Sequence, residues 1–330
     1  MSAAKEAKMN TIQAVNLALS DAMTDDPNVI VFGEDVADTE GGGVVGVTGG
    51  LSGKFGGRVR STPISEQAII GAAIGASIAG LRPVAEIMLM NFTTVAMDML
   101  VNHAAKLRFM SGGQTNVPIT VRTMTGAGMG SGGQHSDYLE AWFAHVAGMK
   151  VVIASSPAES YGLLRSCIED DDPCLFVENT PTYWNPGAAP VSGTRIPLGN
   201  ANVLRAGSDV TVVSYGPQVA LVAGVADKLS KEGISVEVID LRTISPWDKE
   251  TVLASVAKTR RAVIVHEAVK PFGVGAEISS VIHEELFSDL KKPVQRVGSA
   301  YCAVPFARAL ESASVPGQAQ VEAAIKATLE

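Results

Sequence analysis

Apolar residues recur along the chain with two alternating periods. Stretches with apolar residues three or four positions apart predict amphipathic helices, and short, almost continuous apolar runs predict buried strands. Helices are expected at 11–27, 66–80, 93–113, 156–172, 217–233, 245–259, 274–287 and 320–330. Strands are expected at 28–35, 82–89, 117–124, 150–156, 173–179, 208–216, 234–242, 261–268 and 294–298. This alternation is typical of parallel sheets covered by helices.

The alternation is interrupted between residues 179 and 200. Four prolines and several glycines replace any periodicity there, which is the composition of a linker. We therefore expect an α/β protein with two three-layer domains and mainly parallel sheets, at 1–185 and 198–330, joined by a linker at 186–197. Thr11 is expected to cap the first helix, and Ser156 and Glu159 form a capping-box pattern at the fourth.

Composition narrows the class of protein. The 330 residues are 46% hydrophobic and 18% charged, so the chain is expected to be globular. Its 34 acids and 26 bases give a net charge of −8 with no basic stripe, which argues against nucleic-acid binding. The run Ala68–Leu81 is too short to cross a bilayer, and the three cysteines lack metal-ligand spacing. A cytoplasmic protein without membrane or nucleic-acid partners is expected.

Glu66 is the first candidate for chemistry. It follows Ser65 at the start of a helix that is apolar on every side and contains Gly71 and Gly75, so we expect that helix to be buried against another backbone. A structural explanation is that Ser65 caps the helix and Glu66 favours the positive end of its dipole. A functional one is that a partly desolvated carboxyl shares a proton with a ligand. The sequence alone leaves both open.

The glycine-rich stretch at 126–137 leads to a second candidate, His135. Gly128, Gly130 and Gly133 match the dinucleotide pattern GxGxxG, but no capped helix and no suitably placed acid follow, so a dinucleotide site is weakly indicated. His135 lies on a loop after a predicted strand, where sites of α/β domains gather. A structural loop with an incidental histidine is the alternative.

A third candidate is the acidic turn at 169–172, where four acids follow the carboxyl end of a predicted helix. Acids are unfavourable at that end of a helix dipole. A solvated loop explains the turn in the simplest way, whereas a bound cation would compensate its charge.

Several stretches together resemble one family over nearly the whole chain. They are "VFGEDV", "RVRSTPISEQAIIGAAIGASIAGLRPVAEIM", "AAKLRFMSGGQ", "GGQHS", "EAWFAHVAGMKVV", "GLLRSCIEDDDPCLFVE" and "IDLRTISPWD". The chain resembles the β subunit of the thiamine-diphosphate-dependent, decarboxylating component of 2-oxo acid dehydrogenase complexes. The resemblance implies a pyrimidine-binding domain followed by a transketolase C-terminal-like domain. It also implies an α2β2 heterotetramer that decarboxylates a 2-oxo acid and acylates the lipoyl group of an acyltransferase core.

The resemblance also implies roles for single residues. Glu66 would hydrogen-bond the aminopyrimidine ring of thiamine diphosphate, Phe92 would pack on that ring and Met88 would line it. His135 would transfer protons and face the lipoyl group. The chain lacks the GDG motif that anchors the diphosphate through Mg²⁺, so a separate α subunit is expected to hold both. A structural K⁺ would be bound by Ile119, Cys167, Ile168, Asp170 and Asp172.

Two stretches leave the substrate and the assembly open. "GGGVVGVTGGL" is closer to acetoin-type members than to typical pyruvate members, and a branched-chain 2-oxo acid is an alternative substrate. "VHEAVKPFGVGAEI" lacks the paired acids and Trp usual in the family, which leaves docking to the acyltransferase open. The other functions considered are a stand-alone carboligating transketolase-like enzyme, a non-catalytic scaffold subunit and a dinucleotide-binding protein.

Overall fold

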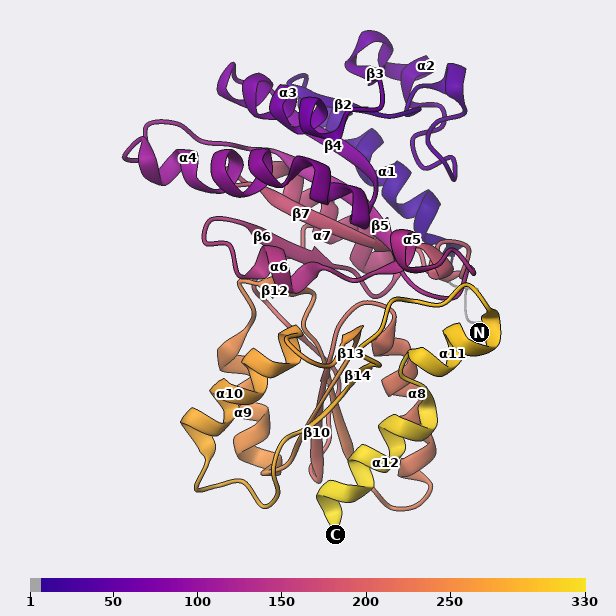
Figure 1. Ribbon diagram of the computed structural model, residues 1–330, viewed down its shortest axis with the longest axis vertical. Helices are drawn as coiled ribbons and strands as arrows, with labels where there is room; N and C mark the ends of the chain where they lie inside the picture. Colours follow the sequence, from indigo (N-terminus) through magenta and orange to yellow (C-terminus); the bar gives the residue numbers. More distant parts are fainter. Residues whose placement is uncertain (1–6) are drawn as a thin grey trace, which may run out of the picture. The chain divides into compact units, whose positions relative to one another are not determined.

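A computed structural model describes residues 7–330 of the chain (Figure 1). These residues form two compact units. Unit 1 contains the described residues up to Thr125 together with Trp142–Leu198, and unit 2 contains Gly126–Ala141 and Gly199–Glu330. The segment Gly126–Ala141 therefore belongs to unit 2, although the chain on both sides of it belongs to unit 1. The expected domain boundaries at 185 and 198 stay a prediction.

Unit 1 is built on a parallel sheet with the strand order β6-β7-β5-β4-β2-β3. The strands are β2 (Val29–Gly33), β3 (Val59–Ser61), β4 (Arg82–Leu89), β5 (Thr120–Thr125), β6 (Lys150–Ile153) and β7 (Cys174–Asn179). Two short strands, β1 (Lys8–Met9) and β8 (Gly187–Ala188), pair antiparallel beside it. The mainly parallel α/β architecture is confirmed.

Helices cover both faces of this sheet (Figure 1). The longer helices and the segment before α4 are α1 (Thr11–Asp25), α3 (Glu66–Ile78), η3 (Met90–Ala96), η4 (Asp98–Ala104), α4 (Ala105–Met110) and α7 (Pro157–Glu169). The short ones are η1 (Asp38–Glu40), α2 (Leu51–Phe55), η2 (Gly56–Arg58), α6 (Glu140–Ala144) and η5 (Thr180–Thr182). Helices α1 and α7 pack against each other and share one apolar core with β2, β4 and β7, because every second strand residue points toward them.

Unit 2 has a five-stranded sheet with the order β14-β13-β10-β11-β9, in which only β9 is antiparallel. Its strands are β9 (Asn202–Arg205), β10 (Val210–Ser214), β11 (Val236–Asp240), β13 (Ala262–Val269) and β14 (Gln295–Ser299), with β12 (Thr243–Ser245) outside that sheet. Its helices are α5 (Gly133–Ser136), α8 (Gln218–Ser230), α9 (Lys249–Thr259), α10 (Val274–Leu286), α11 (Arg308–Ser314) and α12 (Gln318–Leu329). Helices α8 and α12 lie on one face, and α9 and α10 on the other (Figure 1).

Two local predictions are wrong. Asn10 caps α1 instead of Thr11: its Oδ1 accepts the N–H of Gln13 at 2.9 Å, and Oε1 of Gln13 accepts the N–H of Asn10 at 3.0 Å. The segment predicted as one helix at 93–113 begins as tight 3₁₀ turns and continues as wider π-type turns before α4. The hydroxyls of Thr93 and Thr94 bond the carbonyls three residues earlier, which favours the tighter winding.

The helices of the described chain are short or interrupted by polar residues. None of them is long and apolar enough to span a membrane.

Gly148 offers a test of the packing in unit 1. Its φ is +97°, and a Cβ there would overlap the carbonyl oxygen of Ala105 in α4. Gly148→Ala is expected to destabilise the protein by about 3 kcal/mol or more, because the strained backbone and the overlap add. Thermal unfolding measures this. Gly224→Ala is the control: it lies in α8 with open space around the new methyl group, so unchanged or higher stability is expected. Equal melting temperatures of the two variants would contradict the packing.

Candidate active site

Glu66 begins α3 at the carboxyl end of β3, where sites of parallel sheets form. Its side chain is partly buried. The side chain of Ser65, which precedes it, makes no capping hydrogen bond, so a Ser65 cap does not explain the start of this helix. The expectation that α3 is buried on all sides is also wrong for this chain. Ile69, Ile70, Ala73 and Ile74 face the interior, whereas a face with Ala68, Ala72, Gly75 and Ile78 is exposed.

Glu34 lies near Glu66 at this edge of the sheet. It was not among the site residues predicted from the sequence. It follows directly after β2, and burial raises its pKa. The negative charges of Asp35 and Glu66 raise it further, so the three acids interact. Asp35 has a left-handed φ of 55°, a strained conformation that often marks functional positions. The pair of acids directly after a buried strand was the signal that could have identified Glu34.

A small pocket opens in unit 1 beside β4 and β5. Its apolar wall is formed by Val44, Val45, Val47, Met88 and Met124, and Gly43, Glu86, Arg122, Thr123 and Tyr183 complete the lining. Met88 thus belongs to the apolar wall of this pocket. The hydroxyl of Thr123 is buried and has no hydrogen-bond partner among the described residues, so a ligand or water could bond it there.

Phe92 is the other predicted ring-contacting residue. It lies in η3 directly after β4, is partly buried, and packs against the same apolar core as Met88. Helix α3, which carries Glu66, packs against η3. Glu66, Met88 and Phe92 therefore all lie toward the carboxyl edge of one sheet.

Arg122 is at the centre of a network of polar contacts at the pocket. Its Nε and Nη2 donate to the two carboxylate oxygens of Glu178 at 2.7 and 2.9 Å, and its Nη1 donates to Glu86 at 2.7 Å. The hydroxyl of Tyr183 donates to Glu178 at 2.7 Å. Burial raises the pKa of Glu86, which the positive charge of Arg122 opposes, and burial also raises the pKa of Tyr183. Arg122 thereby compensates two carboxylates inside the protein.

His135 lies in α5 of unit 2, after the glycine-rich loop 126–132. This loop is bound by carboxylates of its own unit. Oε1 of Glu267 accepts the N–H of Ala127 at 2.7 Å, and Oε1 of Glu311 accepts the N–H of Gly128 at 2.7 Å. These amides therefore already bind acids of the same chain, which argues against a dinucleotide phosphate at the loop.

A further buried acid, Glu140, follows the His135 segment. The hydroxyl of Tyr215 donates to it at 2.5 Å, and burial raises the pKa of Glu140 to about 7. Burial likewise raises the pKa of Glu267 to about 7, and the charges of Glu140 and Glu311 raise it further. Three acids, Glu140, Glu267 and Glu311, thus lie around the segment that carries His135. No local pattern in the sequence predicts this arrangement.

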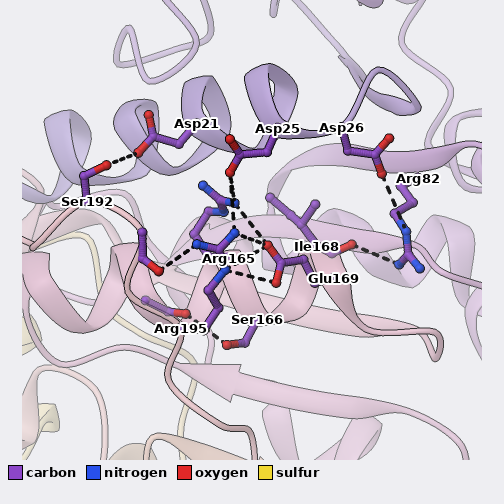
Figure 2. A network of polar contacts seen from close by, with 12 residues as sticks. Asp21, Asp25, Asp26, Arg82, Arg165, Ser166, Ile168, Glu169, Ser192 and Arg195 are labelled. Carbon is purple, nitrogen blue, oxygen red and sulfur yellow. Dashed lines mark hydrogen bonds and ion pairs between the residues drawn. The ribbon is translucent and has the colours of Figure 1, made fainter.

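The acidic turn after α7 is compensated by cationic side chains. Figure 2 shows the pairs of Arg165 and Arg195 with Glu169 and the bond of Arg82 to the carbonyl of Ile168. Nη1 of Arg82 donates to the carbonyls of Ile168 and Asp170 at 3.3 and 3.0 Å. Lys150 pairs with Asp170 at 2.6 Å, and Arg108 pairs with Asp172 at 2.7 Å. The charge of the turn therefore does not require a bound cation.

The predicted potassium ligands nevertheless lie close together. Cys167 and Ile168 end α7, and the carbonyl of Cys167 accepts the N–H of Asp170. Ile119 joins them because Val117, two residues before it, donates to the carbonyl of Asp171. The potassium site stays a prediction.

The comparisons with known proteins agree with this architecture. The transketolase pyrimidine-binding domain matches residues 7–184, and the transketolase C-terminal domain matches residues 199–321. A split-gene transketolase, solved as an inactive β4 tetramer, has the same fold with a TM-score of 0.78. It is 22% identical and covers 97% of this chain and 98% of its own. The matched domains define a two-domain transketolase-like protein.

Relatives of similar length narrow the class further. The β subunit of acetoin:2,6-dichlorophenolindophenol oxidoreductase from Cupriavidus necator is 42% identical over 98% of both chains. The β subunit of the pyruvate dehydrogenase E1 component from Staphylococcus epidermidis is 41% identical, over 98% of this chain and 99% of the relative. The chain belongs to the family of pyruvate and acetoin dehydrogenase E1 β subunits.

Replacement of Arg122 tests the network beneath the pocket. Arg122→Met leaves Glu86 and Glu178 buried without their cation, so we expect a loss of about 3–5 kcal/mol in the free energy of unfolding. Arg195→Met is the matched control, because Arg195 pairs with Asp25 and Glu169 at the surface and is expected to contribute about 1 kcal/mol or less. Denaturant titration compares the two, and equal losses would refute the compensating role of Arg122.

Proposed function

We propose that this chain is the β subunit of a thiamine-diphosphate-dependent 2-oxo acid dehydrogenase of the pyruvate or acetoin type. The observation that carries the proposal is the placement of Glu66, Met88 and Phe92 at one sheet edge in a chain that matches such β subunits over almost its full length. When bound, thiamine diphosphate would supply a nucleophilic thiazolium carbon and an electron sink for the decarboxylation of a 2-oxo acid.

The residues of unit 1 fit the aminopyrimidine half of this cofactor. A planar ring needs an apolar wall, which Met88 provides in the pocket and Phe92 provides after β4. Glu66 would hold a proton at the ring nitrogen, a task that suits a carboxyl in the first turn of a helix beside another acid. The buried hydroxyl of Thr123 adds a polar group that still lacks a partner in the described chain. His135 would move protons at the substrate and face the lipoyl group.

A separate α subunit would complete the site. The sequence has no GDG motif for the diphosphate and Mg²⁺, so both are assigned to the partner. The exposed apolar face of α3 supports a protein partner, as do Phe109 and Met110 at the end of α4, which are 89% and 76% exposed. We assign these exposed apolar residues to the contact with the α subunit in an α2β2 heterotetramer. This complex would act in the cytoplasm and transfer acyl groups to a lipoyl-bearing acyltransferase core. A structural K⁺ at the acidic turn completes the proposal.

Glu66→Gln tests the central role. Co-expressed with its α subunit, the wild type should decarboxylate a 2-oxo acid in the presence of thiamine diphosphate and Mg²⁺. We expect the variant to lose about a hundredfold or more in kcat, because Gln cannot exchange a proton with the ring. Product formation is measured with pyruvate, branched-chain 2-oxo acids and acetoin, which also identifies the substrate.

The control for this variant is Glu277→Gln. Glu277 is an exposed acid in the first turn of α10, so it shares the helix-dipole role of Glu66 without the proposed cofactor contact. Its replacement should leave kcat unchanged. Near-normal turnover of Glu66→Gln in a folded complex would refute the assignment.

His135→Ala separates two half-reactions. If His135 serves the lipoyl group, acylation of a lipoyl domain should fall by about a hundredfold, whereas decarboxylation with an artificial electron acceptor should fall much less. Both rates are measured on one preparation of the complex. Equal losses in the two assays would show that His135 has no lipoyl-specific role.

A further inference from the structure

The loop that leads to His135 adopts a conformation that glycine makes possible. Gly126, Gly128, Gly130 and Gly132 all have φ between +69° and +123°, and they alternate with residues of ordinary backbone conformation. Alternation of this kind turns successive N–H groups toward one side of the chain and creates a concave donor surface, which binds anions. In this chain the anions are two carboxylates of unit 2.

Glu311 makes the larger share of these bonds. Its Oε1 accepts the N–H of Gly128 at 2.7 Å, and both its oxygens lie 3.2 Å from the amide nitrogen of Gly130. The side chain is 2% exposed, so the carboxylate lies inside the unit. Glu267 adds the bond to the N–H of Ala127. Hydrogen bonds to a charged acceptor in a poorly solvated site are stronger than those between neutral groups.

The segment directly before α11 holds the part of the loop next to His135. Gly132 packs so closely on the Phe306 ring that a Cβ there would overlap it, and a Cβ on Gly133 would lie 3.0 Å from that of Ala303. The N–H of His135 in turn donates to the carbonyl of Gly132 at 3.2 Å. The backbone of His135 is therefore connected to Glu311 through a short, tightly packed segment.

From these contacts we infer that Glu311, supported by Glu267, is a positioning residue for His135. It holds the glycine-rich loop by its amides and so sets where the imidazole is presented. This inference rests on the proposed function for the chemistry of His135, whereas the hold on the loop is independent of it. The C-terminal unit then contributes to catalysis directly, by orienting a reacting group, as well as to folding.

The first experiment measures the loop itself. Hydrogen–deuterium exchange of the peptide 126–141 is followed in the αβ complex for wild type, Glu311→Ala and Asp209→Asn. The alanine variant should exchange faster, because the amides of Gly128 and Gly130 lose their acceptor. Asp209→Asn is the matched control: Asp209 also binds a backbone amide of unit 2, that of Ser235, without contact to the loop. Unchanged exchange in Glu311→Ala would overturn the inference.

The second experiment links the loop to His135. Glu311→Ala should lower lipoyl acylation by about tenfold to a hundredfold, the size of effect that a misplaced reacting group causes, with most of the loss in kcat and less in KM. In the His135→Ala background the same change should have no further effect, because the residue that Glu311 positions is gone. Multiplied losses in the double variant would overturn the inference even if the loop had become mobile.

Two outcomes need separate treatment. If Glu311→Ala does not assemble with the α subunit, Glu311→Gln decides by the same two measurements, since it keeps the shape but replaces one acceptor oxygen with an amide donor. An inactive wild-type complex would overturn the proposed function, and with it the role assigned to His135. Exchange at 126–141 would still show whether Glu311 holds the loop.

Discussion

Arg122 lies between Glu86 and Glu178 inside the sheet of unit 1, and without it both carboxyl groups would be buried with no cation beside them. Unit 2 compensates two of its buried acids without a cation. Glu267 and Glu311 accept backbone N–H groups instead. Both kinds of contact hold their residues in place, because removal of one partner would leave the other buried without a hydrogen bond. Arg122 and its acids line the pocket in this way, and Glu267 and Glu311 hold the His135 loop.

The fold was largely predictable from the sequence, whereas several of its details were not. Buried parallel strands such as β2 and β10 give nearly continuous apolar runs, and helices such as α8 keep a regular apolar period, so both can be recognised in a short stretch of sequence. The helix predicted at 93–113 was wrong in its first half because hydroxyls of Thr93 and Thr94 tighten the backbone. The short α2 and the edge strand β3 lie among glycines whose conformation depends on tertiary contacts.

The candidate site shows the same division. Met88 and Phe92 were predicted from the family resemblance, and Glu66 from its place at the start of an apolar helix together with that resemblance; their roles stay predictions. Glu311 is 183 positions away from Gly128 along the chain, and no local pattern joins the two residues. The sequence also could not predict that one face of α3 is exposed. A helix buried by its own chain and a helix buried by a partner have the same apolar composition.

The division of the chain between the two units bears on how the site works. The segment Gly126–Ala141 leaves β5 of unit 1 and returns to unit 1 at Trp142, yet its hydrogen bonds to Glu267, Glu311 and Tyr215 lie within unit 2. A loop tied at both ends to one unit and bound by the other has little conformational freedom left to lose. In its proposed role, His135 would therefore lose little conformational entropy when it is ordered for reaction, which is the advantage of a preorganised group. In most positions glycine destabilises a fold, because it loses much backbone entropy on folding. Here it is favourable, since only glycine readily adopts the φ values that let the amides converge on one carboxylate.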